Sequence, residues 1–117
     1  MKIKTYNYND DYSQGGTSST NVEITATLID LESVLGEPTE NYGGIDDKVQ
    51  HEWVLDVEID GEHHTITIYD WKEYHYIDRY DEIDWHIGAK GGYASANIAK
   101  AVKKEIEDKI KSLIRVI

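Results

Sequence analysis

Apolar and polar residues alternate along several short stretches of the chain, which is typical of β-strands that bury one face. The strongest case lies on both sides of Asp60-Gly61, a dipeptide that favours a tight hairpin turn because both positions tolerate positive φ. Centring the turn there sets Trp53 opposite Ile68 and gathers the apolar side chains of both strands on one face. That face carries Trp53, Leu55, Val57, Ile59, Ile66 and Ile68.

Other stretches predict further strands and two helices. Alternation indicates strands at residues 2–8, 22–26 and 83–87. Residues 28–35 change to helical spacing before Gly36 and Pro38, which predicts one or two helical turns. The other elements are a loop at 9–19, an acidic loop at 39–49, an irregular segment at 70–81, and an amphipathic helix at 98–117 with Ser95 as the best N-cap candidate.

The predicted fold class is therefore α+β, in a single domain that spans residues 1–117. An antiparallel β-sheet with a central β-hairpin would pack its apolar face against the long C-terminal α-helix.

Composition and charge narrow the function classes. The chain has 117 residues and no Cys, so a thiol nucleophile, a disulfide framework and a Cys-ligated zinc site are excluded. The net charge of −11 is uneven: residues 1–92 balance at −14 and residues 93–117 at +3. Because a broad basic footprint is missing, we expect no nucleic-acid partner. Without a membrane-length apolar run or a signal-peptide h-region, we expect no membrane partner and a cytoplasmic protein.

The segment around residues 85–97 joins a strand, a glycine-rich turn at Gly88–Gly92 and the start of a helix. Backbone amides of such a turn, together with the helix N-terminus, favour an anion. A tryptophan and a histidine before the turn would stack on a base. The alternative is that the glycines only form a tight turn and a cap, because the P-loop spacing is absent. The residues assigned to this site are Trp85, His86, Lys90, Gly91, Gly92, Ser95 and Asn97.

A second candidate follows the hairpin at Tyr69-Asp70-Trp71-Lys72. Trp71, with Lys72 or Arg79, would clamp a base and a phosphate, since aromatic side chains stack on any base. The alternative is aromatic packing at the sheet edge or at a subunit interface.

Catalysis and metal binding are not expected. The five histidines form no H-E-x-x-H motif, and the chain has no serine nucleophile elbow. The carboxylates at 78–84 alternate outward or lie in loops, so they indicate solvated surface rather than an acid/base pair. We therefore expect a non-enzymatic protein that needs no cofactor.

Three segments together resemble small phage proteins: Leu35-Gly36-Glu37-Pro38, the strands from Glu52-Trp53-Val54 to Thr67-Ile68-Tyr69-Asp70-Trp71-Lys72, and Asp84-Trp85-His86-Ile87-Gly88. The specific resemblance is to the phage anti-Thoeris sponge family, over residues 35–117. That family sequesters the cyclic ADP-ribose isomers made by TIR-domain enzymes of bacterial defence.

The resemblance implies a binder that leaves its ligand intact, in the cytoplasm of a bacterial host, assembled as a homodimer or higher oligomer. It also implies a ligand at the subunit interface. The positions that match the family's roles are Trp85 or Trp71 for stacking, Asn97 for polar contact, and Arg115 or Arg79 for phosphate.

Two rival functions remain open from the sequence. One is an acidic DNA mimic, or another protein-binding inhibitor of a bacterial defence effector such as an anti-CRISPR; the acidic balance of residues 1–92 supports it. The other is a small hydrolase that acts through the carboxylates at 78–84.

Overall fold

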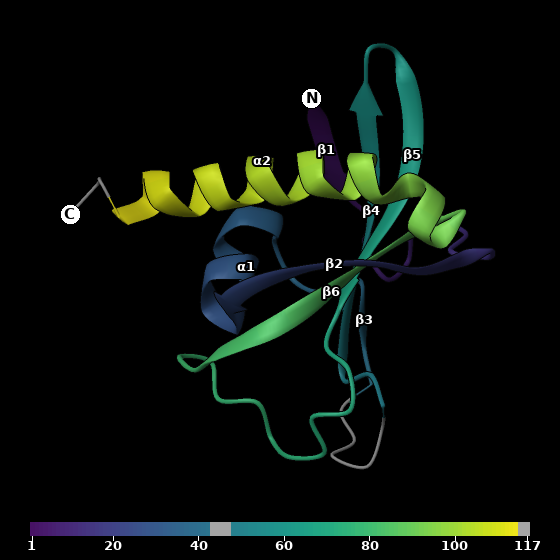
Figure 1. The fold of residues 1–117 in the computed structure, drawn as a ribbon. Helices are drawn as coiled ribbons and strands as arrows, with labels where there is room; N and C mark the ends of the chain where they lie inside the picture. Colours follow the sequence, from purple (N-terminus) through teal and green to yellow (C-terminus); the bar gives the residue numbers. More distant parts are fainter. Residues whose placement is uncertain (43–47, 115–117) are drawn as a thin grey trace.

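The chain folds into an antiparallel sheet with a long helix across one face (Figure 1). A computed structural model describes residues 1–42 and 48–114, and within them the sheet has six strands. The strands are β1 (Lys2–Thr5), β2 (Thr17–Thr27), β3 (Glu40–Asn41), β4 (His51–Ile59), β5 (Glu62–Tyr69) and β6 (Glu82–Lys90). The helices are α1 (Leu28–Leu35), the short 3-10 helix η1 (Gly92–Ser95) and α2 (Ala96–Ile114). The predicted α+β class is confirmed.

The sheet order is β1-β4-β5-β6-β2, with β3 paired to β4. The predicted hairpin is confirmed in its register, since Trp53 pairs with Ile68 and Ile59 with Glu62. Asp60 has φ 52 and Gly61 has φ 81, as the two-residue turn requires. The hairpin lies at the centre of the order and projects beyond α2 (Figure 1).

The core lies between the sheet and α2, on what we call the inner face of the sheet. Strand residues at alternating positions bury their side chains there, and α2 contributes one stripe of its surface. Helix α1 adds a third group beneath α2 (Figure 1). The buried residues include Trp53, Leu55, Val57, Ile66, Ile68, Trp85 and Ile87 from the sheet, Leu28, Leu31 and Leu35 from α1, and Ala99, Val102 and Ile106 from α2.

Helix α1 matches its prediction at both ends. The Thr27 hydroxyl accepts a hydrogen bond from the Asp30 amide at 3.1 Å, which caps the N-terminus. Gly36 follows the last turn with φ 84, a conformation that costs glycine little. Among the described helices, none is both long enough and apolar enough to cross a bilayer.

Two strand boundaries differ from the sequence prediction. Strand β2 begins at Thr17, within the expected loop, and a bulge between Ser19 and Val22 shifts its register. Strand β6 continues through Lys90, so the expected glycine turn at Gly88–Gly92 is wrong over its first three residues. Both extensions have one cause: β2 and β6 pair with each other from Thr17 opposite Lys90 onward.

The opposite, outer face of the sheet also carries buried side chains. The edge of β4 is closed between β1 and β3 by Thr39, whose hydroxyl donates to the Tyr6 carbonyl at 2.6 Å and accepts from the Val54 amide at 2.9 Å. Val54 and Thr67 are buried although they point away from the core. Where β5 pairs with β6, the outer face carries the aromatic side chains of Tyr69 and His86.

Candidate functional site

Four side chains line a cleft of about 340 Å³ on the outer face: Ser19, Tyr69, Trp71 and His86. We call this cleft the aromatic pocket. Tyr69 and His86 are paired residues of β5 and β6, so their side chains leave the sheet together. Their rings stack with centroids 5.7 Å apart and an interplanar angle of 21°. The Trp71 ring meets Tyr69 edge-on at 6.4 Å and 79°. The result is a set of three rings on one side of the molecule.

Gly88 allows the Tyr69 ring to lie close to the sheet. It belongs to β6 and pairs with Thr67. A Cβ added at this position would lie 2.4 Å from the Thr67 hydroxyl oxygen and 3.3 Å from Tyr69 Cε1. Any larger residue would therefore force both side chains away from the sheet. Gly88 therefore shapes the aromatic pocket by leaving room for the side chains of Thr67 and Tyr69.

A buried carboxylate anchors the segment that carries Trp71. Asp70 is 1% exposed, and its Oδ1 accepts from the Gln50 amide at 2.6 Å. Its Oδ2 lies 3.0 Å from His51 Nδ1. On the other side of Trp71, the Lys72 amide donates to the Lys48 carbonyl at 2.7 Å. Hydrogen bonds thus fix the residues on both sides of Trp71, while Trp71 itself stays 42% exposed.

The backbone beyond Trp71 is in an unfavourable conformation. Lys72 has φ 55 and Tyr74 has φ 50, in the left-handed region that few residues other than glycine adopt. Such a conformation costs roughly 1–2 kcal/mol per residue and persists where surrounding contacts determine it.

Charges of both signs surround the aromatic pocket. Lys72 Nζ lies 5.5 Å from the centroid of the Trp71 ring. Glu23 lies 3.8 Å from His86 Nδ1. Burial raises the pKa of Tyr69, an effect that a hydrogen bond from the Ser19 hydroxyl opposes. The Tyr69 hydroxyl therefore remains protonated at neutral pH and can donate a hydrogen bond.

In the aromatic pocket, the structure brings together two of the residues predicted from the sequence, Trp71 and His86. The expectation that Trp85 stacks on a ligand is wrong, because its side chain is 0% exposed. Its indole nitrogen donates to the Ala26 carbonyl at 3.0 Å, and its ring packs edge-on against Trp53 at 5.3 Å. Trp85 is a core residue.

The predicted anion site at the β6–α2 junction depends on free backbone amides in the glycine turn, and the fold itself uses part of that backbone. Gly88 pairs with both Ser19 and Thr67, so its backbone belongs to the sheet. The Ala94 amide donates to the Gly91 carbonyl at 3.1 Å, and the Ser95 hydroxyl donates to the Lys90 carbonyl at 2.6 Å instead of capping α2.

Gly91 and Gly92 are required by the fold at this junction. Both have positive φ, at 85 and 52. A Cβ on Gly92 would lie 2.6 Å from the Ser18 hydroxyl oxygen. The close approach that Gly92 permits is therefore to strand β2, whereas the atoms nearest Gly91 belong to Ser95 and Ala94.

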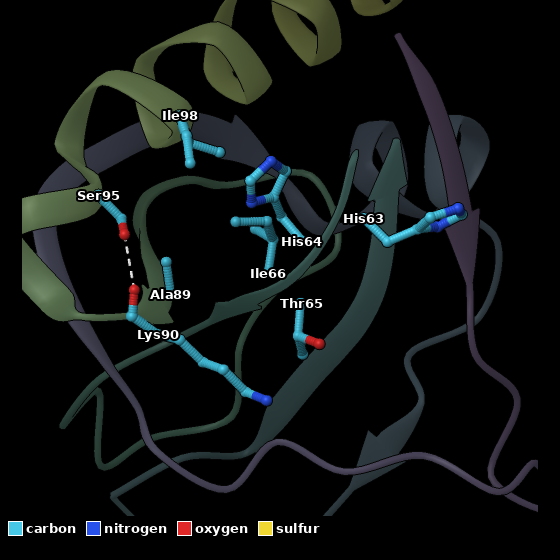
Figure 2. Close-up of a pocket in the computed structure, with 8 residues that line it drawn as sticks. All are labelled: His63, His64, Thr65, Ile66, Ala89, Lys90, Ser95 and Ile98. Atoms are coloured by element: carbon cyan, nitrogen blue, oxygen red, sulfur yellow. Dashed lines mark hydrogen bonds between the residues drawn. The ribbon is translucent and has the colours of Figure 1, made fainter. Parts of the chain in front are cut away.

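A small cleft of about 130 Å³ does lie at this junction (Figure 2). Lys90 and Ser95 line it together with Ala89 of β6, Ile98 of α2 and the first half of β5. Figure 2 shows the Ser95 hydroxyl directed at the Lys90 carbonyl. The three tryptophans do not line this cleft, so it does not combine an anion site with base stacking.

The remaining predicted site residues are dispersed. Arg79 Nη1 lies 2.8 Å from Glu32 Oε1 of α1. Asn97 is exposed at the start of α2, which packs on the inner face, away from the aromatic pocket. Arg115 lies outside the described residues. In the described part of the chain, no group of three or more His, Asp or Glu side chains could hold a metal ion.

Sequence reasoning missed Ser19, and it placed Tyr69 in the second candidate segment without assigning it a ligand contact. The signal for Tyr69 was present, because the confirmed hairpin register already directs it away from the core. The pairing of β5 with β6, which adds His86 and Gly88, and the extension of β2 to Ser19 had no local sequence signal.

Comparisons with protein-family models, with curated proteins and with solved structures found no match to this chain. The functional argument therefore depends on the aromatic pocket and its surroundings.

Proposed function

We propose that this protein binds and sequesters a nucleotide signal without cleaving it, with the base held in the aromatic pocket. The resemblance to anti-Thoeris sponges makes cyclic ADP-ribose isomers the leading ligands. The protein would then help a phage to evade immune signalling inside a bacterial cell. The observation that carries the proposal is the group of three aromatic rings around one cleft on the outer face of the sheet.

Stacking supplies the main binding energy in this proposal. Base–aromatic stacking contributes roughly 1–3 kcal/mol per base. The stacked Tyr69–His86 pair forms a preorganised surface, and the exposed Trp71 ring stands beside it. Because these rings are already in place, little side-chain ordering opposes binding.

A lysine beside the aromatic pocket fits the phosphates of such a ligand. Lys72 Nζ already lies 5.5 Å from the centroid of the Trp71 ring. The surrounding carboxylates would repel a free anion, which favours a ligand whose phosphates are carried on an aromatic base. The lining residues contain no carboxylate pair, so nothing in the pocket resembles the acid and base of a hydrolase.

We expect cyclic ADP-ribose isomers to raise the melting temperature of the purified chain by roughly 10 °C when the ligand is at a hundred times its Kd, because ligand binding adds to the free energy of unfolding. Differential scanning fluorimetry with each isomer, with ADP-ribose and with NAD measures this. Chromatography of the released ligand should recover it unchanged, and native mass spectrometry gives the oligomer order.

An unchanged melting temperature with every nucleotide would contradict the proposal. The acidic DNA mimic would then be the better hypothesis, and the chain should bind a basic protein with an affinity that falls steeply as the salt concentration rises. A ligand that binds but returns as a new product would also contradict it.

A further inference from the structure

A second cleft of about 420 Å³ on the outer face is lined by Gln14, Tyr42, Lys48, Val49 and Glu52. We call it the polar pocket. Its lining differs in kind from that of the aromatic pocket, with one amide, one phenol, one carboxylate, one ammonium and one apolar side chain. No part of the argument for base binding uses it.

The two pockets are neighbours. Glu52 of the polar pocket and Tyr69 of the aromatic pocket are direct partners on β4 and β5. Side chains of such a pair leave the sheet on the same face, about 4.5–5.5 Å apart at their Cβ atoms. The charge of Glu52 also contributes to the raised pKa of Tyr69, which places the two groups within electrostatic reach. One ligand of moderate size would reach both pockets.

The polar pocket offers hydrogen-bond acceptors. Glu52 Oε1 accepts from the Tyr42 hydroxyl at 3.2 Å. Gln14 Oε1 is buried, and no described residue donates a hydrogen bond to it. A buried amide oxygen without a partner is rare, and a bound group that donates a hydrogen bond would satisfy it. A ligand moiety that fits here must therefore carry donors.

The charges nearby select among the possible donors. Glu40 is the cross-strand partner of Glu52, and its carboxylate contacts the Tyr12 hydroxyl. These two carboxylates outnumber the one lysine that lines the pocket, Lys48, so the net charge disfavours a phosphate. Burial raises the pKa of Glu52, while the hydrogen bond from Tyr42 opposes that shift. A neutral group with adjacent hydroxyls satisfies both Glu52 and Gln14 without adding charge.

We infer that the polar pocket binds the vicinal diol of a ribosyl group, with Glu52 and Gln14 as the acceptors. This inference rests on the proposed nucleotide binding and specifies the ligand as a ribosylated base. A carboxylate that accepts from ribose hydroxyls is a general solution in nucleotide-binding proteins. The base would occupy the aromatic pocket, and the sugar would lie across Tyr69 beside Glu52.

Isothermal titration of the full chain with adenosine and with 2′,3′-dideoxyadenosine tests the inference. The two probes share the base and differ only in the sugar hydroxyls. We expect the wild type to bind adenosine roughly tenfold more tightly, because hydrogen bonds to a charged acceptor are the stronger kind. Glu52→Gln should reduce this preference to roughly threefold or less and leave dideoxyadenosine binding unchanged.

Two further variants keep the test independent of folding defects. Gln14→Ala, in a segment outside the strands, should also reduce the preference for adenosine. Glu58→Gln is the matched control, because Glu58 lies on the same face of β4 but does not line the polar pocket. It should keep the tenfold preference. An equal loss in Glu58→Gln would show a general charge effect and overturn the inference.

The outcomes separate this inference from the proposed function. Equal affinity of the wild type for adenosine and dideoxyadenosine overturns the diol site while base binding stands. No binding of either probe, or of a cyclic ADP-ribose isomer, overturns both.

Discussion

Trp71→Ala is expected to weaken the binding of a cyclic ADP-ribose isomer by roughly 10- to 100-fold, because it removes one stacking surface from the aromatic pocket. The melting temperature of the free protein should change by no more than about 2 °C, since the Trp71 ring is 42% exposed and lies outside the core. Titration calorimetry and a thermal melt measure the two quantities.

Tyr76→Ala is the matched control for Trp71→Ala. Tyr76 lies in the same segment after β5 and is 79% exposed, but it does not line the aromatic pocket. Its loss should leave affinity unchanged. Unaltered affinity in Trp71→Ala, or an equal loss in Tyr76→Ala, would remove Trp71 from the binding site.

Trp85→Phe is expected to lower the free energy of unfolding by roughly 2–3 kcal/mol and the melting temperature by roughly 10 °C. Phenylalanine leaves part of the indole volume empty and cannot donate to the Ala26 carbonyl. It also changes the edge-on contact with Trp53. Urea unfolding followed by circular dichroism gives the difference.

Trp71→Phe controls for the chemistry of this substitution. The same change at an exposed ring should alter the free energy of unfolding by less than about 0.5 kcal/mol. Trp85→Phe, by contrast, should leave the affinity of the folded protein for nucleotide nearly unchanged. A stable Trp85→Phe variant that no longer binds would restore Trp85 as a ligand contact.

The hairpin shows what the sequence could predict. Only one register places every large apolar side chain of β4 and β5 on the inner face, except Val54, and the turn at Asp60-Gly61 fixes the same register independently. Local chemistry and the hydrophobic pattern agree there. The same agreement explains why the bounds of α1 were predicted correctly, since the helical spacing of its leucines and the position of Gly36 both end the helix at Leu35.

Trp85 shows a signal that was present and misread. The alternation of Ile83, Trp85 and Ile87 already assigned all three side chains to one face, and that face is the core. The three nearby glycines, Gly88, Gly91 and Gly92, suggested instead that the backbone approaches a ligand closely. In the structure, Gly88 accommodates a close contact with Thr67, and Gly92 accommodates one with Ser18.

The aromatic and polar pockets could not be predicted because both depend on distant contacts. His86 meets Tyr69 only through the pairing of β5 with β6 across the irregular segment at 70–81. Gln14 reaches the polar pocket from a segment that precedes β2. Neither contact has a local pattern, since loop paths over a sheet face leave no periodic signal in the sequence.

The most direct test of the binding site is an NMR titration of the ¹⁵N-labelled chain with the ligand that gives the largest thermal shift. We predict that the largest chemical-shift changes fall on Ser19, Tyr69, His86 and the indole NH of Trp71. Changes concentrated between Lys90 and Asn97, with an unmoved Trp71 indole, would contradict the assignment of the base to the aromatic pocket.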